Sequence, residues 1–169
     1  MGAGDIHLRL FHYQIQMEIK VSMKDDSPEV IELVTEVWRE FDCVLLIDIE
    51  ERHLLDPGKY FREHGGEFWV VRENGKLIAT AGVKINDTVA EMKTLYVKKE
   101  FRGKGLGTAL TNLAIETALE RGVKSFELWS DTRFTDAHRM YERLGFVRFD
   151  ERDLGDHNHS KEFGFRRDI

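Results

Sequence analysis

The hydrophobic and polar positions in the first third of the chain predict a strand followed by a helix. Met17–Ser22 alternates as a half-buried strand does, and Ser27 followed by Pro28 favours a helix start with Ser27 as the N-cap. The helix is expected to reach about Glu40, because apolar residues recur on one face: Val30, Val34, Val37, Trp38 and Phe41. From residue 41 to 66 the pattern weakens, with a helical run at ERHLL and a turn at Asp56-Pro57-Gly58.

The middle of the chain has the pattern of an antiparallel meander. EFWVVRE and KLIATAGVK flank Asn74-Gly75, a pair that tolerates the positive φ angles of a two-residue hairpin turn. A third strand is expected over about Ala90–Lys98. The three segments therefore predict consecutive antiparallel strands.

A helix is expected next, from Gly105 to Arg121, with Gly122 as its C-terminal stop. One stripe of this helix is apolar enough to pack on the sheet, and it consists of Leu106, Leu110, Leu113, Ala114, Thr117 and Ala118. SFELWS follows as a strand, and Asp136 is expected to cap a short helix that ends at Gly145. Residues 146–149 and 161–165 are expected to close the sheet around the polar loop 153–160.

Three glycines, Gly103, Gly105 and Gly107, stand between the third strand and the long helix. Without a Cβ, the backbone there can turn with its amides pointing inward and let a ligand approach closely. The first amides of the helix lack partners, and the positive end of the helix dipole favours an anion. Arg102 and Lys104 add positive charge. The stretch therefore predicts a phosphate-binding turn.

Two rival phosphate motifs are excluded by spacing. The glycines run G-x-G-x-G, so the dinucleotide fingerprint G-x-G-x-x-G fails, and the chain has no G-x-x-x-x-G-K-S/T. The formal net charge of −6 also lacks the basic surplus of a general nucleic-acid binder. We therefore expect no nucleic acid as partner.

Length and composition indicate one globular domain over residues 17–169, with residues 1–16 as an N-terminal extension. No apolar run approaches the roughly 18 residues of a membrane span, and no signal-like block opens the chain, so no membrane is expected. The single cysteine, Cys43, reads as a small core residue in a reducing compartment. We therefore expect a cytoplasmic protein.

Two motifs carry a family resemblance. Arg102–Gly107 fits the Q/R-x-x-G-x-G/A signature of the GNAT superfamily of acetyl-CoA-dependent N-acetyltransferases, directly after LYV. AHRMYERLGF, Ala137–Phe146, resembles the family's tyrosine-bearing helix that ends in a Gly-Phe step. Asp136 departs from the pattern, since many relatives carry Asn there. The resemblance covers about residues 67–149.

The resemblance implies an α/β fold with a mixed, mostly antiparallel sheet of six or seven strands, flanked by helices. The sheet would be splayed between the strand of Leu95 and that of Leu128, where acetyl-CoA enters. The pyrophosphate would lie on the glycine turn, and the pantetheine arm would pair with the strand before it. The implied cofactor-binding residues are Leu95, Tyr96, Val97, Arg102, Gly103, Lys104, Gly105, Leu106, Gly107 and Thr108. No metal is expected.

The implied reaction is direct attack of a primary amine on the acetyl thioester in a ternary complex, with a backbone amide near Val97 stabilising the oxyanion. Tyr141 matches the family tyrosine and would protonate the leaving thiolate. Glu91 is the candidate base and His138 the reserve. Each has a structural alternative: Tyr141 as a core aromatic, Glu91 as a surface carboxylate paired with Lys93, and His138 as a surface helix residue.

His157 and His159 are read as part of a polar loop rather than a metal site, and Cys43 is not needed as a nucleophile. The acceptor is expected to be a small amine. Acidic residues near the expected mouth mildly favour a cationic one: Asp42, Asp48, Glu50 and Glu51. Two other functions stay open, a non-catalytic acyl-CoA sensor and a protein or peptide N-acetyltransferase. Analogy with the family adds a homodimer.

Overall fold

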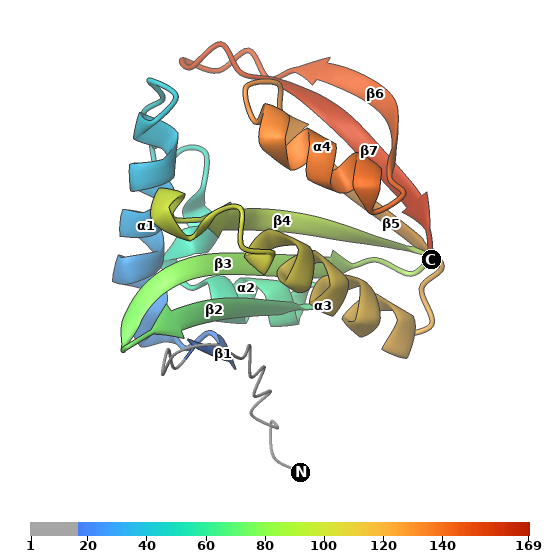
Figure 1. Ribbon diagram of the computed structural model, residues 1–169, viewed down its shortest axis with the longest axis horizontal. Coiled ribbons are helices and arrows are strands. Elements are labelled where there is room, and N and C mark those ends of the chain that lie inside the picture. Colours follow the sequence, from blue (N-terminus) through green and yellow to red (C-terminus); the bar gives the residue numbers. More distant parts are fainter. Residues whose placement is uncertain (1–16) are drawn as a thin grey trace.

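The computed structural model describes residues 17–169 and contains a twisted seven-stranded sheet with helices on both faces (Figure 1). The strands are β1 Met17–Val21, β2 Glu67–Glu73, β3 Lys76–Ile85, β4 Val89–Val97, β5 Ser125–Asp131, β6 Val147–Asp153 and β7 Lys161–Asp168. The helices are α1 Ser27–Arg39, α2 Pro57–Glu63, α3 Leu106–Glu120 and α4 Thr135–Arg143, with 3-10 turns η1 Lys24–Asp26, η2 Arg52–Leu55 and η3 Lys99–Phe101.

The strand order is β1-β2-β3-β4-β5-β7-β6, and β4 with β5 is its one parallel pair. The mixed, mostly antiparallel sheet expected from the sequence is confirmed. The Asn74-Gly75 hairpin is confirmed as well, since Asn74 has φ 50° and Gly75 has φ 81°, the positive values that a two-residue turn of this kind requires.

The sheet opens between β4 and β5. The two strands pair from Val89 with Ser125 as far as Met92 with Leu128, and no further. Beyond that point Thr94 takes a positive φ of 57°, and the register with β3 shifts between Thr80 and Gly82, so the second half of β4 bends away. The expected splay between the strands of Leu95 and Leu128 is therefore present, and Figure 1 shows β5–β7 diverging from β1–β4.

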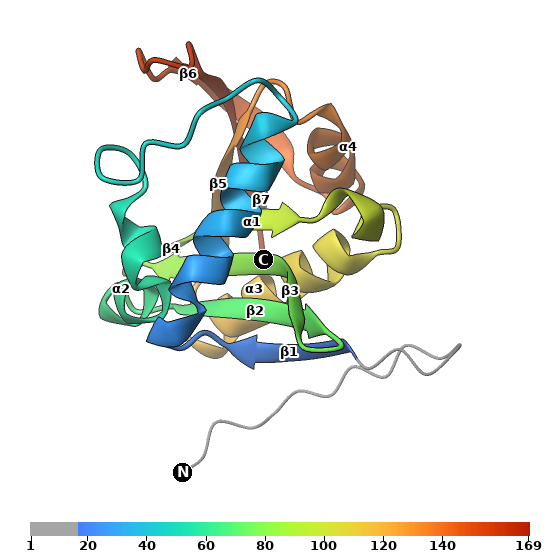
Figure 2. The same cartoon turned by 90° about the vertical axis from the view of Figure 1, so that its left-hand side faces the viewer.

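Each face of the sheet has its own apolar core. Turning the molecule shows α1 and α2 over one face and α3 behind the sheet on the other (Figure 2). The α1/α2 side is built on fully buried side chains such as Leu33, Leu54, Phe61 and Phe68. On the opposite side Leu110 and Ala114 of α3 pack with Phe126, Phe165 and Tyr141. Burial of these two faces holds the splayed strands at a fixed separation.

Three sequence expectations on helix starts are corrected. Asp56-Pro57-Gly58 is not a turn but the start of α2, because the Asp56 carboxylate accepts from the Lys59 amide at 3.2 Å and Pro57 fits the first helical position. Ser27 lies inside α1 and donates to the Leu55 carbonyl at 3.0 Å, leaving Asp26 at the N-cap.

The third correction concerns α4. Phe134, not Asp136, is at the N-cap, and the exposed Asp136 carboxylate accepts from Arg139 at 2.9 Å instead of capping the helix. The departure from the family's asparagine therefore leaves the helix intact.

No helix within residues 17–169 is long and apolar enough to cross a membrane. The proposed extension at residues 1–16 lies outside the described residues, so the boundary at Met17 stays a prediction.

Candidate active site

Two cavities meet at the splay between β4 and β5. The first, of about 580 Å³, is lined by the glycine turn and α4 and is called the glycine cavity here. The second, of about 350 Å³, is called the carboxylate cavity and is lined by five acidic side chains: Glu50, Glu51, Asp131, Asp156 and Glu162. Six residues line both cavities, namely Phe41, Leu95, Tyr96, Phe134, Ala137 and Tyr141. A ligand in one cavity would therefore lie next to a ligand in the other.

The glycine turn forms the floor of the glycine cavity. Gly103 has φ 72° and Gly105 has φ 84°, and a Cβ on either would meet no atom within 4 Å, so their backbone faces open space. Gly105 is the N-cap of the 15-residue helix α3, whose first amides have no intrahelical partners. Gly107 lies opposite Met140, whose Sδ would be 3.1 Å from an added Cβ. These features suit a bound pyrophosphate.

Of the two cations expected to support this turn, Arg102 lines the glycine cavity but is paired with a carboxylate, and Lys104 does not line it. The guanidinium of Arg102 binds both oxygens of Glu40, at 2.7 and 2.8 Å, and its Nε donates to the Val97 carbonyl at 2.8 Å. Arg102 therefore ties the turn to the end of α1 and to β4. Lys104 is exposed, lies 5.3 Å from the Phe101 ring centre, and is not among the residues lining the cavity.

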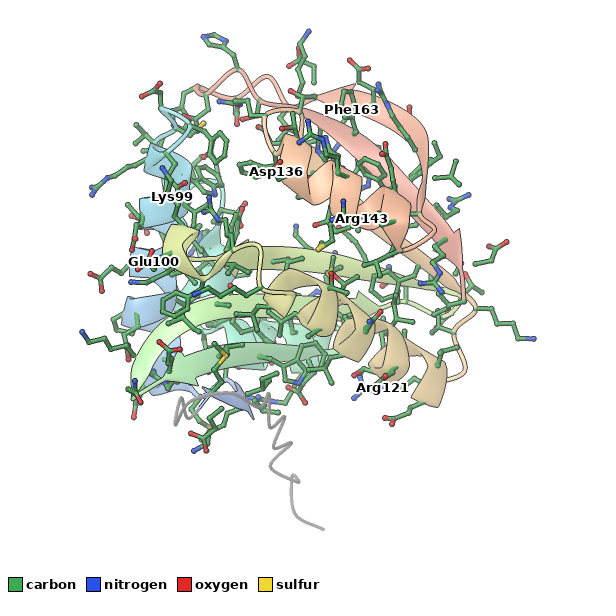
Figure 3. The ribbon with its side chains drawn as sticks, viewed as in Figure 1. Lys99, Glu100, Arg121, Asp136, Arg143 and Phe163 are labelled. Carbon is green, nitrogen blue, oxygen red and sulfur yellow. The ribbon has the colours of Figure 1, made fainter. Side chains whose placement is uncertain are left out.

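Besides Arg102, the cations that line the glycine cavity come mainly from α4. Arg139, Met140 and Arg143 share its wall, with Arg133 from the preceding loop. Figure 3 shows Asp136 and Arg143 at opposite ends of α4, above α3. Arg139 is paired with Asp136, whereas Arg143 has no ion pair among the described residues. Sequence reasoning missed this basic wall, although Asp136, Arg139, Met140 and Arg143 have the three- and four-residue spacing of one helical face.

Tyr141 lies where the two cavities join. Its ring is 5% exposed and packs between Phe146 and Phe165, with ring centres 5.9 and 5.6 Å away. Burial raises the pKa of its phenol well above the usual value, which keeps the hydroxyl protonated at neutral pH. The hydroxyl makes no hydrogen bond to any residue from 17 to 169, so the backbone partner of the alternative reading is absent there.

Most of the acidic side chains in the carboxylate cavity are already paired. Arg133 binds Asp131 through two nitrogens, Arg152 lies 2.6 Å from Glu162, and His157 Nδ1 lies 3.0 Å from Glu50. Lys93 is the one basic side chain in the lining. Asp42 and Asp48 do not line the cavity. The surplus of negative charge that favoured a cationic acceptor is therefore smaller than the sequence indicated.

Two loops contribute to the wall of the carboxylate cavity and contact each other. Asn158 in the β6–β7 loop donates to the Val44 carbonyl and accepts from the Val44 amide, both at 2.9 Å. His157 Nε2 also lies 2.9 Å from the Val44 carbonyl. Both nitrogens of His157 are thus engaged within the loops. These contacts join the α1–η2 connection to the β6–β7 loop.

Cys43 is buried, as expected from the sequence, and it also contributes to this cavity's wall. Its Sγ accepts from Arg133 Nη1 at 2.6 Å and donates to the Phe41 carbonyl at 3.4 Å. Desolvation raises the pKa of the thiol in spite of the arginine, so the thiolate is disfavoured.

Glu91, the base expected from the sequence, lines neither cavity. Its carboxylate lies 2.8 Å from Lys84 on β3, not beside Lys93. The register between β3 and β4 pairs Glu91 with Lys84, so its carboxylate binds a lysine of the sheet and does not line a cavity. The placement does not support Glu91 as base.

His138, the reserve, is buried rather than on the surface, and its Nε2 lies 3.2 Å from Ser130 Oγ. Desolvation lowers the pKa of this imidazole. It lines neither cavity.

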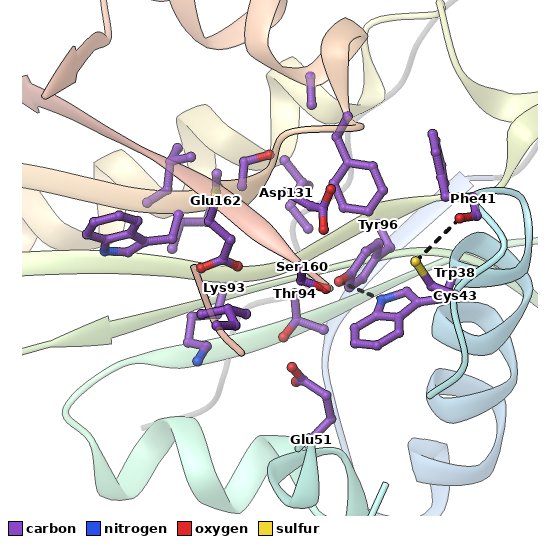
Figure 4. A pocket seen from close by; sticks show the side chains of 18 of the residues that line it. Trp38, Phe41, Cys43, Glu51, Lys93, Thr94, Tyr96, Asp131, Ser160 and Glu162 are labelled. Atoms are coloured by element: carbon purple, nitrogen blue, oxygen red, sulfur yellow. Dashed lines mark hydrogen bonds between the residues drawn. The ribbon is translucent and has the colours of Figure 1, made fainter. Parts of the chain in front are cut away.

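Glu51 was expected from the sequence only as one of the acidic residues near the mouth, not as a base. It lines the carboxylate cavity, and Figure 4 shows it below Thr94 and Tyr96. Desolvation raises the pKa of its carboxyl to about 7, although Lys93 lowers it. Its Oε2 lies 3.4 Å from Nδ1 of His53, a ring whose pKa desolvation lowers to about 4.

Comparison with known proteins gives a family. Residues 28–146 match the model of the acetyltransferase (GNAT) family. An uncharacterised N-acetyltransferase of Methanocaldococcus jannaschii is 34% identical over 130 residues, covering 73% of this chain and 57% of its own. N-acetylaspartate synthetase of Xenopus tropicalis is 30% identical over 115 residues, covering 65% of this chain and 40% of its own. The chain therefore spans about half the length of these relatives.

The fold agrees with this match. A Salmonella typhimurium protein, described as an acetyltransferase with its cofactor acetyl-CoA, superposes with a TM-score of 0.69 at 19% identity. The superposition covers 90% of this chain and 93% of that one. Since the family model spans well over half of the residues, the chain belongs to the acetyltransferase (GNAT) family.

Proposed function

We propose that the protein transfers the acetyl group of acetyl-CoA to a small primary amine, by direct attack in a ternary complex. The observation that carries the proposal is the junction of the two cavities at Tyr141. A coenzyme arm in the glycine cavity would bring its thioester to that junction, and an amine in the carboxylate cavity would meet it there. The reaction needs no covalent enzyme intermediate.

The glycine cavity fits the coenzyme by its chemistry. The free amides from Gly103 to Thr108 and the N-terminus of α3 suit the pyrophosphate, whereas the Arg102 amide already donates to the Lys99 carbonyl. The second half of β4, Leu95–Val97, is free of β5 and can pair with an extended arm. Bound acetyl-CoA would supply a reactive thioester carbonyl. A backbone amide near Val97 would stabilise the negative charge that develops on its oxygen.

Tyr141 would act as the acid. Its raised pKa keeps the proton on the phenol until a strong base, the departing thiolate, is next to it. A pure acyl-CoA sensor would not need an unpaired, protonated hydroxyl at the junction, so Tyr141 favours an enzyme over that alternative.

The volume of the carboxylate cavity and the joined loops in its wall favour a small acceptor over a protein or peptide. A cavity of about 350 Å³ is at the lower end of the range for small-molecule sites. The Val44–Asn158 and Glu50–His157 contacts hold together the two loops that contribute to its wall, whereas a peptide acceptor would need an extended open groove. A homodimer, which the family resemblance implies, is proposed with this function and is checked by light scattering.

Two measurements test the function. Isothermal titration should show acetyl-CoA binding, and a thiol reagent should report CoA release in the presence of an accepted amine. The amines to screen are amino acids, polyamines, aminoglycosides and short peptides. Absence of acetyl-CoA binding at millimolar concentration would refute the proposal, and preferred turnover of peptides would replace the small amine as acceptor.

Arg143→Ala should weaken acetyl-CoA binding about tenfold, because Arg143 is the unpaired cation in the basic wall of α4 and a charged hydrogen bond contributes roughly 1.5 kcal/mol or more. Isothermal titration gives the Kd. Arg39→Ala is the matched control, since Arg39 is exposed at the end of α1 and lines neither cavity. Equal Kd values for the two variants would remove Arg143 from the coenzyme site.

A further inference from the structure

We propose that Glu51 is the catalytic base that takes a proton from the acceptor's ammonium group, and that His53 positions its carboxylate. The inference rests on the proposed acetyl transfer, since an amine must lose a proton before it can attack a carbonyl. Glu51 and His53 lie between α1 and α2, in the stretch with the weakest sequence pattern. Neither belongs to the glycine turn or to the tyrosine helix.

The location of Glu51 is the first argument. It lines the carboxylate cavity together with Thr94, Leu95 and Tyr96 of β4, the strand segment that would run beside the thioester. An amine bound between Glu51 and the cavity junction at Tyr141 would have a carboxylate on one side and the phenol on the other. The two proton transfers of the reaction would then use separate groups.

The surroundings of Glu51 suit a base that works near neutral pH. Its side chain is 25% exposed, so water reaches it only in part. The charged groups that act on its pKa are Lys93 of β4, Glu162 of β7 and Glu50 of its own segment. Tyr96 and His53 are the other titratable groups beside it. Lys93 favours the carboxylate, whereas Glu50, Glu162 and burial oppose it, and the pKa comes to about 7. A base is most effective when its pKa is near the working pH.

His53 holds Glu51 toward the cavity. Its side chain is 8% exposed and packs against Tyr60 and Phe61, with ring centres 5.1 and 5.8 Å away. Its Nε2 lies 3.0 Å from Thr94 Oγ1, and its Nδ1 faces Glu51 Oε2 at 3.4 Å.

The ring is neutral at pH 7, because its pKa is about 4, and it carries one proton. With that proton on Nδ1, the ring turns a donor toward the carboxylate, 3.4 Å away, and its Nε2 accepts from the Thr94 hydroxyl.

Thr94 connects Glu51 and His53 to the place where β4 separates from β5. It is the residue with φ 57° at the bend of β4, and its carbonyl accepts from Thr80 Oγ1 at 2.9 Å. The contacts Glu51–His53–Thr94 therefore fix the base relative to the strand where the thioester would lie. A carboxylate on an untethered loop would not keep that distance.

The proton balance closes with these residues. Glu51 takes one proton from the ammonium, and the neutral amine forms a C–N bond to the thioester carbonyl carbon. As the C–S bond breaks, Tyr141 gives its proton to the sulfur and regains one from the new amide nitrogen. Glu51 returns its proton to solvent. The net products are the acetamide, free CoA and one proton.

Glu51→Gln should lower kcat/KM for the amine about hundredfold near pH 7 and leave the Kd of acetyl-CoA unchanged. Glu63→Gln, on the exposed side of α2, is the matched control and should keep the wild-type rate. The pH dependence of kcat/KM distinguishes the wild type from Glu51→Gln more sharply than the rate at one pH. Wild-type kcat/KM, calculated on total amine, should rise to about pH 7 and then level off. In Glu51→Gln it should rise about tenfold per pH unit toward the amine's own pKa near 10.

A stability measurement tests Glu51 without turnover. A carboxyl whose folded pKa is raised from 4.5 to about 7 contributes stability below pH 4.5, and this contribution is lost as pH rises through 7. Glu51→Gln should therefore melt at a higher temperature than the wild type at pH 8 and at about the same temperature at pH 4.5. Equal melting temperatures at both pH values would overturn the proposed environment of Glu51.

His53 is tested as a positioning residue by its effect on the base. His53→Phe keeps the ring packing and removes Nδ1–H, so the inflection in the pH profile should move above 7. His53→Asn returns a donor at that position and should restore the inflection. An unchanged inflection in His53→Phe would limit His53 to packing.

The experiments distinguish failure of Glu51 as the base from failure of the proposed acetyltransferase function. If acetyl-CoA binds and the wild type turns over, but Glu51→Gln retains the wild-type rate and pH profile, Glu51 is not the base and the acetyltransferase proposal stands. If activity is lost in Glu91→Gln and not in Glu51→Gln, Glu51 is likewise not the base and the acetyltransferase proposal stands. If acetyl-CoA does not bind at all, the function itself fails.

Discussion

Replacing Tyr141 by phenylalanine is expected to lower kcat about hundredfold or more, with the Kd of acetyl-CoA changed by no more than about twofold. The reason is that the phenol lies at the junction of the two cavities and makes no hydrogen bond to residues 17–169, so its loss leaves no partner unsatisfied. The ring, which packs on Phe146 and Phe165, is kept. Steady-state thiol release and isothermal titration give the two quantities.

Tyr60→Phe is the matched control for this substitution. Tyr60 lies on α2, lines neither cavity, and loses the same single hydroxyl. Its variant should retain the wild-type kcat. If the Tyr141 variant keeps the wild-type rate, the thiolate leaves without this acid, and Tyr141 is a core aromatic. If the wild type binds acetyl-CoA but turns over no amine, the sensor alternative gains support.

The parts of the fold that follow from neighbouring residues could be predicted from the sequence. Asn74-Gly75 specifies its turn because two adjacent residues must take positive φ, and Gly103, Gly105 and Gly107 mark the turn before α3 for a similar reason. The apolar stripe of α3 and the alternation of β5 report burial directly. The splay needed more, because it depends on where β4 stops pairing with β5. The family resemblance supplied it.

The parts of the site that depend on contacts between distant segments could not be predicted. Glu91 was predicted as the base because it is on β4, the strand that would run beside the thioester. Its partner is instead Lys84, which the β3–β4 register places opposite it. Glu51 is in a stretch without periodicity, and its position becomes visible only when η2 packs its neighbour His53 against Thr94. Arg102 carries the charge expected at a phosphate, yet Glu40 of the α1 terminus occupies its guanidinium.

The environment of Cys43 also depends on a residue that is distant in sequence. The arginine that donates to its sulfur is not Arg39, four positions earlier, but Arg133, 90 positions later. A thiol that looks inert by its neighbours thus lies in a charged cavity wall. It remains a poor nucleophile because burial has the larger effect on its pKa.

Gly105→Val is expected to raise the Kd of acetyl-CoA about hundredfold while the protein still folds. Gly105 has φ 84°, a conformation that costs a β-branched residue on the order of 1–2 kcal/mol, so the turn should relax and its amides should no longer converge. Loss of one or two amide hydrogen bonds to a charged phosphate costs roughly 1.5–3 kcal/mol each. The added side chain would also enter the open space that the turn faces. Isothermal titration measures the Kd, and thermal unfolding measures the stability.

Gly122→Val separates the strain from the binding. Gly122 follows the opposite end of α3, has φ 77°, and likewise has no atom within 4 Å of an added Cβ. The two variants should therefore lose similar stability, because they force the same kind of backbone conformation on a β-branched residue. Only Gly105→Val should lose affinity for acetyl-CoA, because only the N-terminus of α3 presents free amides and a positive dipole to the glycine cavity. Equal affinity in both variants would mean that the coenzyme phosphates do not bind at the glycine turn, and the basic wall of α4 would then have to hold them alone.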